Sequence, residues 1–150
     1  MPIFYHGTIK EYLPEIIKSG IIETTVGTYD DQGVFLTNTP RSALMWARSH
    51  CSNTFQESEQ LRKKYKNCTP IVLRIRVPKN KISKLAPDWN RLTDIEESED
   101  EDIDPNISWQ ESLKMVHELK YIDPIPIIWV DRMCQDEQCH KWTNINRIAI

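Results

Sequence analysis

Three residues near the N-terminus, His6, Gly7 and Thr8, combine a titratable ring, an unhindered backbone and a hydroxyl group. They follow the apolar residues 3–5, which predict a short strand that ends at Gly7. Because glycine lacks a Cβ, a ligand can approach its N–H and C=O closely. A histidine at a strand end beside such a glycine is suited to hydrogen-bond a ribose or a phosphate. A turn with a histidine satisfied by the protein itself is the alternative interpretation.

Aromatic side chains follow at Phe35 and Trp46. Residues 33–37, Gly-Val-Phe-Leu-Thr, predict a second strand, and residues 40–47 predict a helix with Pro40 in its first turn. Two aromatic rings at such a strand–helix junction can enclose a flat ligand ring. Burial of both rings in the core is the competing interpretation.

Glu118 is the candidate carboxylate, predicted at the start of a strand and followed by a proline turn at residues 124–126. A carboxylate beside a cleft can orient a ribose hydroxyl and stabilise a developing positive charge. Its neighbour His117 is expected to face away, since successive strand residues point to opposite faces. A surface position for Glu118 is the alternative, and Glu111 is its nearest competitor.

The order and spacing of these segments resemble the ADP-ribosyltransferase superfamily, in the His–Tyr–Glu branch that includes diphtheria-toxin-like and poly(ADP-ribose)-polymerase-like domains. The resemblance covers roughly residues 3–130, and its motifs are short. It implies an α+β fold, with a core of two packed β-sheets and flanking helices. It also implies an NAD-dependent ADP-ribosyltransferase that takes NAD as co-substrate and cleaves the nicotinamide–ribose bond.

The resemblance assigns a role to each candidate residue. His6 would bond a ribose of NAD, the Gly7 backbone would hold the nicotinamide amide, and Glu118 would be the catalytic carboxylate beside His6. The expected NAD-binding residues are His6, Gly7, Thr8, Phe35, Ser42 and Trp46. Phe35 departs from the pattern, because the family usually has a tyrosine there, and phenylalanine keeps the stacking face without the hydroxyl.

Two other functions stay open at this stage. A non-catalytic module that binds NAD or ADP-ribose is favoured by the missing tyrosine hydroxyl at Phe35. An RNA 2′-phosphotransferase-like enzyme is related, but it needs several cleft arginines around its histidine, whereas His6 is flanked by Tyr5 and Gly7. The acceptor of ADP-ribose is also open, and protein, nucleic acid, a small molecule and water all qualify.

The elements that must position these residues are predicted from periodicity within one domain spanning residues 1–150. Thr8 is expected to cap a helix that Gly20 ends. Residues 71–77 predict a strand with alternating apolar and arginine positions. Residues 127–130 predict another strand, and residues 144–150 a final edge strand. The polar residues 56–66 predict a further helix.

The one shift in composition is residues 94–104, with eight acidic residues and no basic one. We expect a solvated loop that is dispensable for folding, because such charge density resists packing. Removing these eight acids from the 22 in the chain leaves 14 against 19 Lys and Arg, a net charge of +5. The basic residues 62–66 contribute to it, as a solvated helix face or as a weak nucleic-acid footprint.

Cysteine usage and hydropathy define the remaining expectations. The four cysteines, at 51, 68, 134 and 139, are read as thiols. Cys134, Cys139 and His140 lie close together in sequence, but they lack the four-ligand spacing of a zinc site, so no metal is expected. No apolar run reaches the roughly 20 residues of a membrane span, and the N-terminus lacks the features of a signal peptide. These features predict a cytoplasmic location without membrane contact.

Overall fold

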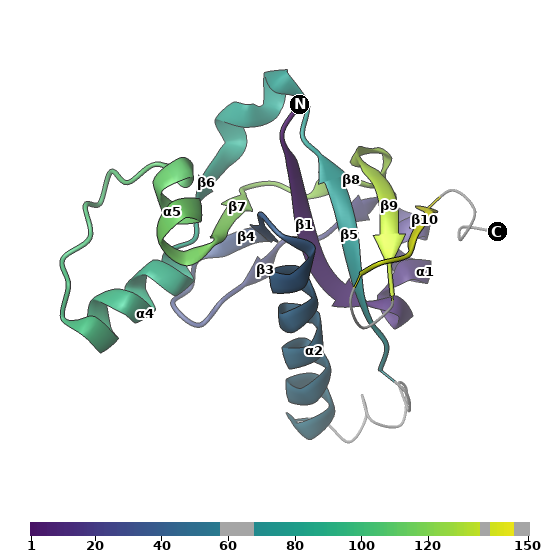
Figure 1. Cartoon of the computed structure of the whole chain (residues 1–150), viewed down its shortest axis with the longest axis horizontal. Coiled ribbons are helices and arrows are strands. Elements are labelled where there is room, and N and C mark those ends of the chain that lie inside the picture. Colours follow the sequence, from purple (N-terminus) through teal and green to yellow (C-terminus); the bar gives the residue numbers. More distant parts are fainter. Residues whose placement is uncertain (58–67, 136–138, 146–150) are drawn as a thin grey trace.

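The computed structural model describes residues 1–57, 68–135 and 139–145 and has an α+β fold built on a large antiparallel sheet (Figure 1). The strands are β1 Ile3–Ile9, β2 Ile21–Ile22, β3 Thr25–Val26, β4 Gln32–Thr37, β5 Pro70–Arg76, β6 Leu85–Pro87, β7 Glu118–Tyr121, β8 Ile125–Pro126, β9 Val130–Cys134 and β10 Trp142–Asn144. The α-helices are α1 Leu13–Ser19, α2 Pro40–Glu57, α4 Trp89–Glu99 and α5 Trp109–Val116. The 3-10 helices are η1 Lys10–Tyr12, η2 Lys79–Lys84 and η3 Ile127–Trp129.

Within the described residues, the large sheet has eight strands in the order β10-β9-β5-β1-β4-β7-β6, with β3 paired to β4. A two-stranded sheet, β2-β8, is separate from it. β1 pairs with β5 along its whole length, from Ile3 opposite Arg76 to Ile9 opposite Pro70. Over their described length, however, β1 and β4 pair at one position, Tyr5 opposite Thr37. The sheet therefore consists of two halves that diverge between β1 and β4.

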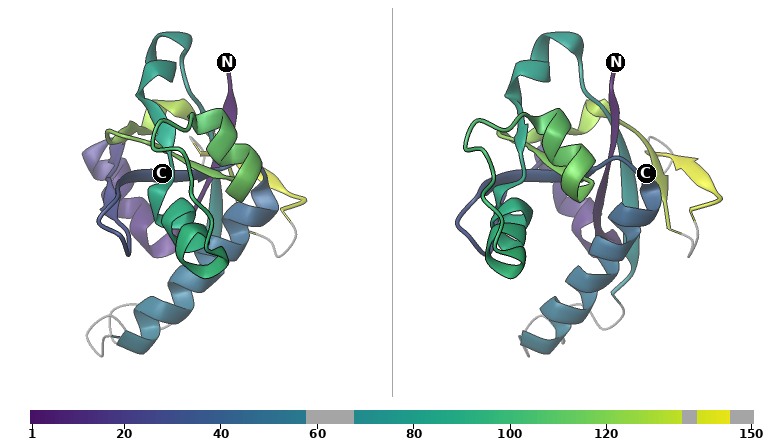
Figure 2. Two further views of the ribbon diagram at one scale, coloured as in Figure 1. Left: turned by 90° about the vertical axis from the view of Figure 1, so that its left-hand side faces the viewer. Right: turned by 60° about the vertical axis from the view of Figure 1, so that its left-hand side comes forward.

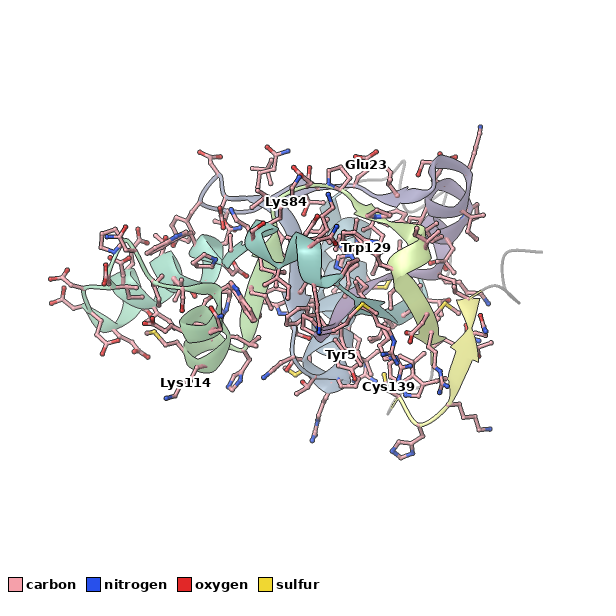
Figure 3. All side chains as sticks on the ribbon, turned by 90° about the horizontal axis from the view of Figure 1, so that it is seen from above. Tyr5, Glu23, Lys84, Lys114, Trp129 and Cys139 are labelled. Atoms are coloured by element: carbon pink, nitrogen blue, oxygen red, sulfur yellow. A yellow bond between two sulfur atoms is a disulfide. The ribbon has the colours of Figure 1, made fainter. Side chains whose placement is uncertain are left out.

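Apolar side chains cover both faces of the half that contains β1, β5 and β9. On one face, Phe4, Leu73 and Ile75 join the largest core cluster, to which α1 contributes Leu13 and Ile16. On the other face α2 packs against β1 and β5 (Figure 1). Viewed from above, Tyr5 and Cys139 lie on the side of α2, and Glu23 lies on the opposite side (Figure 3).

The second half of the sheet is bordered by α4 and α5, which lie together on one side of the molecule (Figure 2). Leu92 of α4 and Val116 of α5 meet Ile107 in a separate small core. Each helix begins at a side-chain cap. Asp88 accepts hydrogen bonds from two α4 N–H groups, and Ser108 accepts one at the start of α5.

The N-terminal strand is longer than expected. β1 continues through Gly7 to Ile9, because its pairing with β5 extends to Pro70. Thr8 is therefore a buried strand residue, and its prediction as a helix cap was wrong. α1 starts at Leu13 and ends at Gly20, whose φ of 76° is the left-handed conformation predicted for that position.

Several other predicted elements are confirmed with shifted bounds. β4, β5 and β7 lie where strands were expected, and α2 begins at Pro40. The apolar residues 127–129 form η3 rather than a strand, and Ile128 is 86% exposed. The final strand, β10, ends at Asn144, where the expected edge strand 144–150 was to begin. Residues 146–150 and the basic residues 62–66 lie outside the described residues.

The acidic segment, residues 94–104, is not simply a loop. Its first six residues belong to α4, and residues 101–104 lack regular structure. Ile95 and Ile103 within it pack against the small core around Leu92. These two side chains pack the segment against the rest of the protein, while most of its carboxylates are exposed. The expectation of a solvated loop was therefore wrong for residues 94–99, which are helical. That the segment is dispensable for folding stays a prediction, and the packing of Ile95 and Ile103 argues against it.

The cysteines also differ from the prediction. Cys51 and Cys68 form a disulfide between α2 and the start of β5, and Cys134 and Cys139 are buried beside α2. A disulfide is more typical of oxidising compartments, so the cytoplasmic location stays a prediction. Within the described ranges, no three His, Cys, Asp or Glu side chains lie where they could jointly hold a metal ion. In the part of the chain that the structure describes, no helix is long and apolar enough to cross a membrane.

The close contact of β1 with α2 makes Gly7 the position most sensitive to a small substitution. A Cβ added at Gly7 would lie 2.0 Å from the Ala43 carbonyl oxygen and 3.0 Å from the Ala47 nitrogen. Both are backbone atoms, so the helix itself would have to move. We expect Gly7→Ala to lower the free energy of unfolding by about 1–3 kcal/mol or more, measured by urea denaturation.

Gly20→Asn is the control, because no atom lies within 4 Å of a Cβ there and asparagine tolerates the left-handed conformation. Its stability should stay near that of the unsubstituted protein. An equally small effect at Gly7 would contradict the close packing.

Candidate functional site

A pocket of about 880 Å³ opens where β1 and β4 diverge. Its other walls come from α1, the segment that contains β2 and β3, the middle of α2 and the first turn of α4. Six of the seven residues predicted for the site line it: His6, Gly7, Thr8, Phe35, Trp46 and Glu118. The pocket thus collects side chains from strands and helices that are far apart in sequence.

His6 bridges the gap between the two halves of the sheet. Its Nδ1 lies 2.7 Å from the carbonyl oxygen of Phe35. Because a carbonyl can only accept, Nδ1 must carry the proton, and Nε2 of a neutral ring is left as an acceptor. Burial lowers the pKa of His6 against the opposing effect of this hydrogen bond, which favours the neutral ring.

Gly7 and Thr8 contribute to the pocket in a more limited way. The α2 backbone behind Gly7 leaves no room for a Cβ at this position. Glycine is therefore needed here for packing, whether or not a ligand binds. Thr8 is 7% exposed and lies beside the cavity. Both residues thus line the pocket, and the packing of α2 against β1 already accounts for the glycine.

The register of β4 and β7 brings the Glu118 carboxylate to the point where β1 and β4 diverge. Thr37 of β4 lies opposite Tyr5 of β1 on one side and opposite Glu118 of β7 on the other. Glu118 is therefore held two strands from β1, at the point where the strands separate. Phe35 lies on the same face of the sheet as Thr37 and Glu118. The alternate β4 residues, Val34 and Leu36, point to the other face and enter the main core.

Glu118 is held by partners from two helices. The indole Nε1 of Trp46 on α2 donates to its Oε1. The Nε of Arg91 on α4 lies 3.8 Å from its Oε2, and the Arg91 guanidinium carbon lies 6.0 Å from the centre of the Trp46 ring. Glu118 is consequently 7% exposed as a residue, although it lines an open pocket.

Asp88 is a second buried carboxyl group beside Glu118. It is 2% exposed and caps α4 by accepting from the N–H groups of Asn90 and Arg91. Ser112 ties the two acids together through the backbone, since its hydroxyl donates to the Glu118 carbonyl at 2.7 Å and accepts from the Asp88 N–H at 3.1 Å. The two carboxyl groups therefore have little freedom to separate.

Burial raises the pKa of both acids, and the hydrogen bond between them raises that of Glu118 while it lowers that of Asp88. Burial is the main cause for Glu118, whose pKa reaches about 8, and the hydrogen bond and negative charge of Asp88 act in the same direction. Burial likewise raises the pKa of Asp88. The bond from Trp46 and the charge of Arg91 oppose the shift at Glu118. One proton is thus retained by the pair near neutral pH, as expected for two carboxyl groups in a confined site.

The loop between β3 and β4 docks onto the start of α4 and closes one wall of the pocket. Tyr29 N–H donates to the Asn90 side chain at 3.0 Å, which in turn donates to the Asp31 carbonyl at 3.1 Å. The Asp31 carboxylate accepts from the Trp89 N–H and from Lys120. This network fixes the orientation of α4 and hence of Arg91.

Sequence reasoning missed the residues that α4 supplies, namely Asp88, Asn90 and Arg91. Asp88 follows Pro87 and precedes a helix, so its capping pattern was detectable. Nothing in the sequence indicated that α4 would meet β7, because that contact depends on the docked β3–β4 loop.

Two predicted or competing residues lie elsewhere. Ser42 does not line the pocket, because its hydroxyl and N–H both bond the Thr39 side chain at the start of α2. Its role as a contact to the nicotinamide amide has no support in this geometry. Glu111, the competitor of Glu118, is an exposed residue that bonds Ser108 at the start of α5.

Comparison of the chain with protein-family models, with curated proteins and with solved structures finds no match.

The buried Glu118 makes stability depend on pH. Its pKa of about 8 exceeds the usual value of 4.5, so the folded state holds a proton that the unfolded state releases. This contribution to stability is fully present below about pH 4.5 and is lost as the pH rises through about 8. Glu118→Gln should therefore gain stability relative to the unsubstituted protein between pH ~5 and ~9, by up to ~1.4 kcal/mol per pKa unit. Thermal unfolding across this range measures the difference.

Glu111→Gln provides the matched control, because it makes the same chemical change at an exposed position outside the pocket. Parallel curves for Glu118→Gln and the unsubstituted protein would show that Glu118 titrates normally.

Proposed function

We propose that the chain is an NAD-dependent ADP-ribosyltransferase with the reaction centred on Glu118. The observation that carries the proposal is the convergence of His6, Phe35, Trp46 and Glu118 on one pocket, at the edge where the sheet divides. The resemblance of the sequence to ADP-ribosyltransferases rests on these residues as well. The proposal also assigns the α+β fold to the ADP-ribosyltransferase type, in which two packed sheets meet at the site.

The proposed binding mode uses groups with defined donor and acceptor capacity. With its proton on Nδ1, His6 presents Nε2 as an acceptor for a ribose hydroxyl. The rings of Phe35 and Trp46 supply apolar surface for the nicotinamide. Trp46 is 45% exposed, so ligand binding would bury further aromatic area.

The proposed chemistry is cleavage of the bond between nicotinamide and ribose, with an oxocarbenium-like transition state. Ionised Glu118 would stabilise the positive charge on the ribose, and Trp46 holds its carboxyl group in place. The cationic nicotinamide ring should lower the pKa of Glu118 on binding, because an opposite charge favours the ionised form. The acceptor, whether macromolecule, small molecule or water, attacks the ribose carbon as nicotinamide leaves.

A non-catalytic NAD-binding module is the second candidate, and two observations favour it. Phe35 provides no hydroxyl, and Glu118 retains a proton near neutral pH in the ligand-free protein. Such a module would bind NAD without releasing nicotinamide, so one assay distinguishes the two candidates.

The deciding experiment compares Glu118→Gln with Glu111→Gln. Glutamine keeps the shape of Glu118 but cannot offset the charge of an oxocarbenium. We expect Glu118→Gln to lower kcat for nicotinamide release by about 10²–10³ with little change in KM, because the interaction is made mainly in the transition state. Nicotinamide is measured by liquid chromatography.

Glu111→Gln should keep full turnover, since its side chain accepts from the Ser108 hydroxyl at the start of α5, outside the pocket. Loss of turnover in Glu111→Gln with normal turnover in Glu118→Gln would show that Glu118 is not the catalytic carboxylate. Binding of NAD without turnover by the unsubstituted protein would favour the non-catalytic module.

Binding itself can be followed through Trp46, one of five tryptophans in the chain. NAD should quench the tryptophan fluorescence and raise the melting temperature, with about 2.7 kcal/mol of added stability at 100 times the Kd. Trp46→Phe should lose most of the quenching. Trp142→Phe is the control, because Trp142 packs on Tyr5 outside the pocket. Equal quenching in all three proteins would place NAD elsewhere.

A further inference from the structure

Arg91 is the feature of the pocket that the proposed reaction does not yet use. Its Nε is buried, and among the described residues it has no hydrogen-bond partner. The nearest carboxylate oxygen, Oε2 of Glu118, is 3.8 Å away, which is beyond hydrogen-bonding distance. A buried donor without a partner is unfavourable, and ligand binding is one way to satisfy it.

The charged residues that line the described pocket include one group that can bind an anion. Of the residues that the structure describes, Arg91 is the one Arg or Lys that lines the cavity, whereas five acidic residues do: Glu15, Glu23, Asp88, Asp94 and Glu118. The histidines add little charge, because burial lowers the pKa of both His6 and His50. An anionic ligand in this pocket therefore has one strong binding group available.

The backbone at the start of α4 cannot take that role. The Trp89 N–H already donates to Asp31 at 2.8 Å, and the N–H groups of Asn90 and Arg91 donate to Asp88. Anions often bind at free N–H groups of a helix start, but here the caps occupy them. Recognition of an anion at this wall falls to the Arg91 side chain.

Arg91 can change partners at small cost. Its guanidinium NH1 bonds Asp94 at 3.3 Å, in an exposed pair of the kind that adds little stability. The side chain is 39% exposed, and its guanidinium lies over Trp46, on the side of the cavity where Glu118 is held. A planar guanidinium can bind two phosphate oxygens at once, which an ammonium cannot.

We propose that Arg91 binds a phosphate group of the ligand and makes the pocket selective for nucleotides with a phosphate close to the reacting ribose. This inference rests on the proposed function for the choice of NAD, whose pyrophosphate adjoins the nicotinamide ribose. The pocket should consequently prefer a nucleoside diphosphate to the corresponding nucleoside.

The test uses adenosine diphosphate and adenosine as probes in isothermal titration calorimetry. The unsubstituted protein should bind the diphosphate about 10- to 100-fold more tightly than adenosine, as expected for hydrogen bonds to a charged group. Arg91→Gln should abolish this preference while leaving adenosine affinity unchanged. Arg91→Lys should retain part of it, because lysine keeps the charge without the bidentate geometry.

Arg132→Gln is the matched control, since it removes the same charge from an exposed position on β9 outside the pocket. It should keep the full preference. An unchanged preference in Arg91→Gln, or no measurable binding of the diphosphate by the unsubstituted protein, would overturn the inference.

The outcomes also separate this inference from the proposed function. Diphosphate binding that depends on Arg91, without any release of nicotinamide from NAD, would contradict the transferase alone. Turnover of NAD with a KM that Arg91→Gln leaves unchanged would contradict the phosphate role alone.

Discussion

The divergence of β1 from β4 after a single residue pair is the constraint on which the pocket depends. Beyond Tyr5 and Thr37 the strands separate, and backbone groups there need other partners. His6 bonds the Phe35 carbonyl across the gap and so keeps it open at a fixed width. Behind β1, Gly7 allows α2 to approach closely enough for Trp46 to reach Glu118 from the opposite half of the sheet.

The same geometry explains why the site is electrostatically unusual. Register places Glu118 at the divergence, and the cap of α4 places Asp88 beside it, so two carboxyl groups share a largely buried space. Two such groups cannot both ionise easily without a cation nearby. Arg91 partly fills that role while its Nε keeps no hydrogen-bond partner among the described residues. Under the proposed function, the positive nicotinamide ring would favour ionised Glu118 and a phosphate would bind Arg91.

Local patterns predicted much of this arrangement, and long-range contacts account for what they missed. Alternation and turn residues identified β4, β5 and β7, and the glycine at position 20 ended α1 as expected. The capping role of Thr8 failed because pairing with β5 extended the strand, which no local pattern reveals. Residues 94–104 were misjudged from charge alone, since Ile95 and Ile103 pack on the small core between α4 and α5. Arg91 was missed because its position depends on the docked loop at Tyr29 and Asp31.

We propose that this divided sheet binds NAD with the nicotinamide end at Glu118. The most direct measurement is a crystal structure of the protein with NAD, or with an analogue that resists cleavage. We expect the nicotinamide ribose between His6 and Glu118, the nicotinamide ring against Phe35 and Trp46, and the pyrophosphate at Arg91. An empty pocket at saturating NAD, or NAD bound on another surface with Glu118 still bonded to Trp46, would contradict the account.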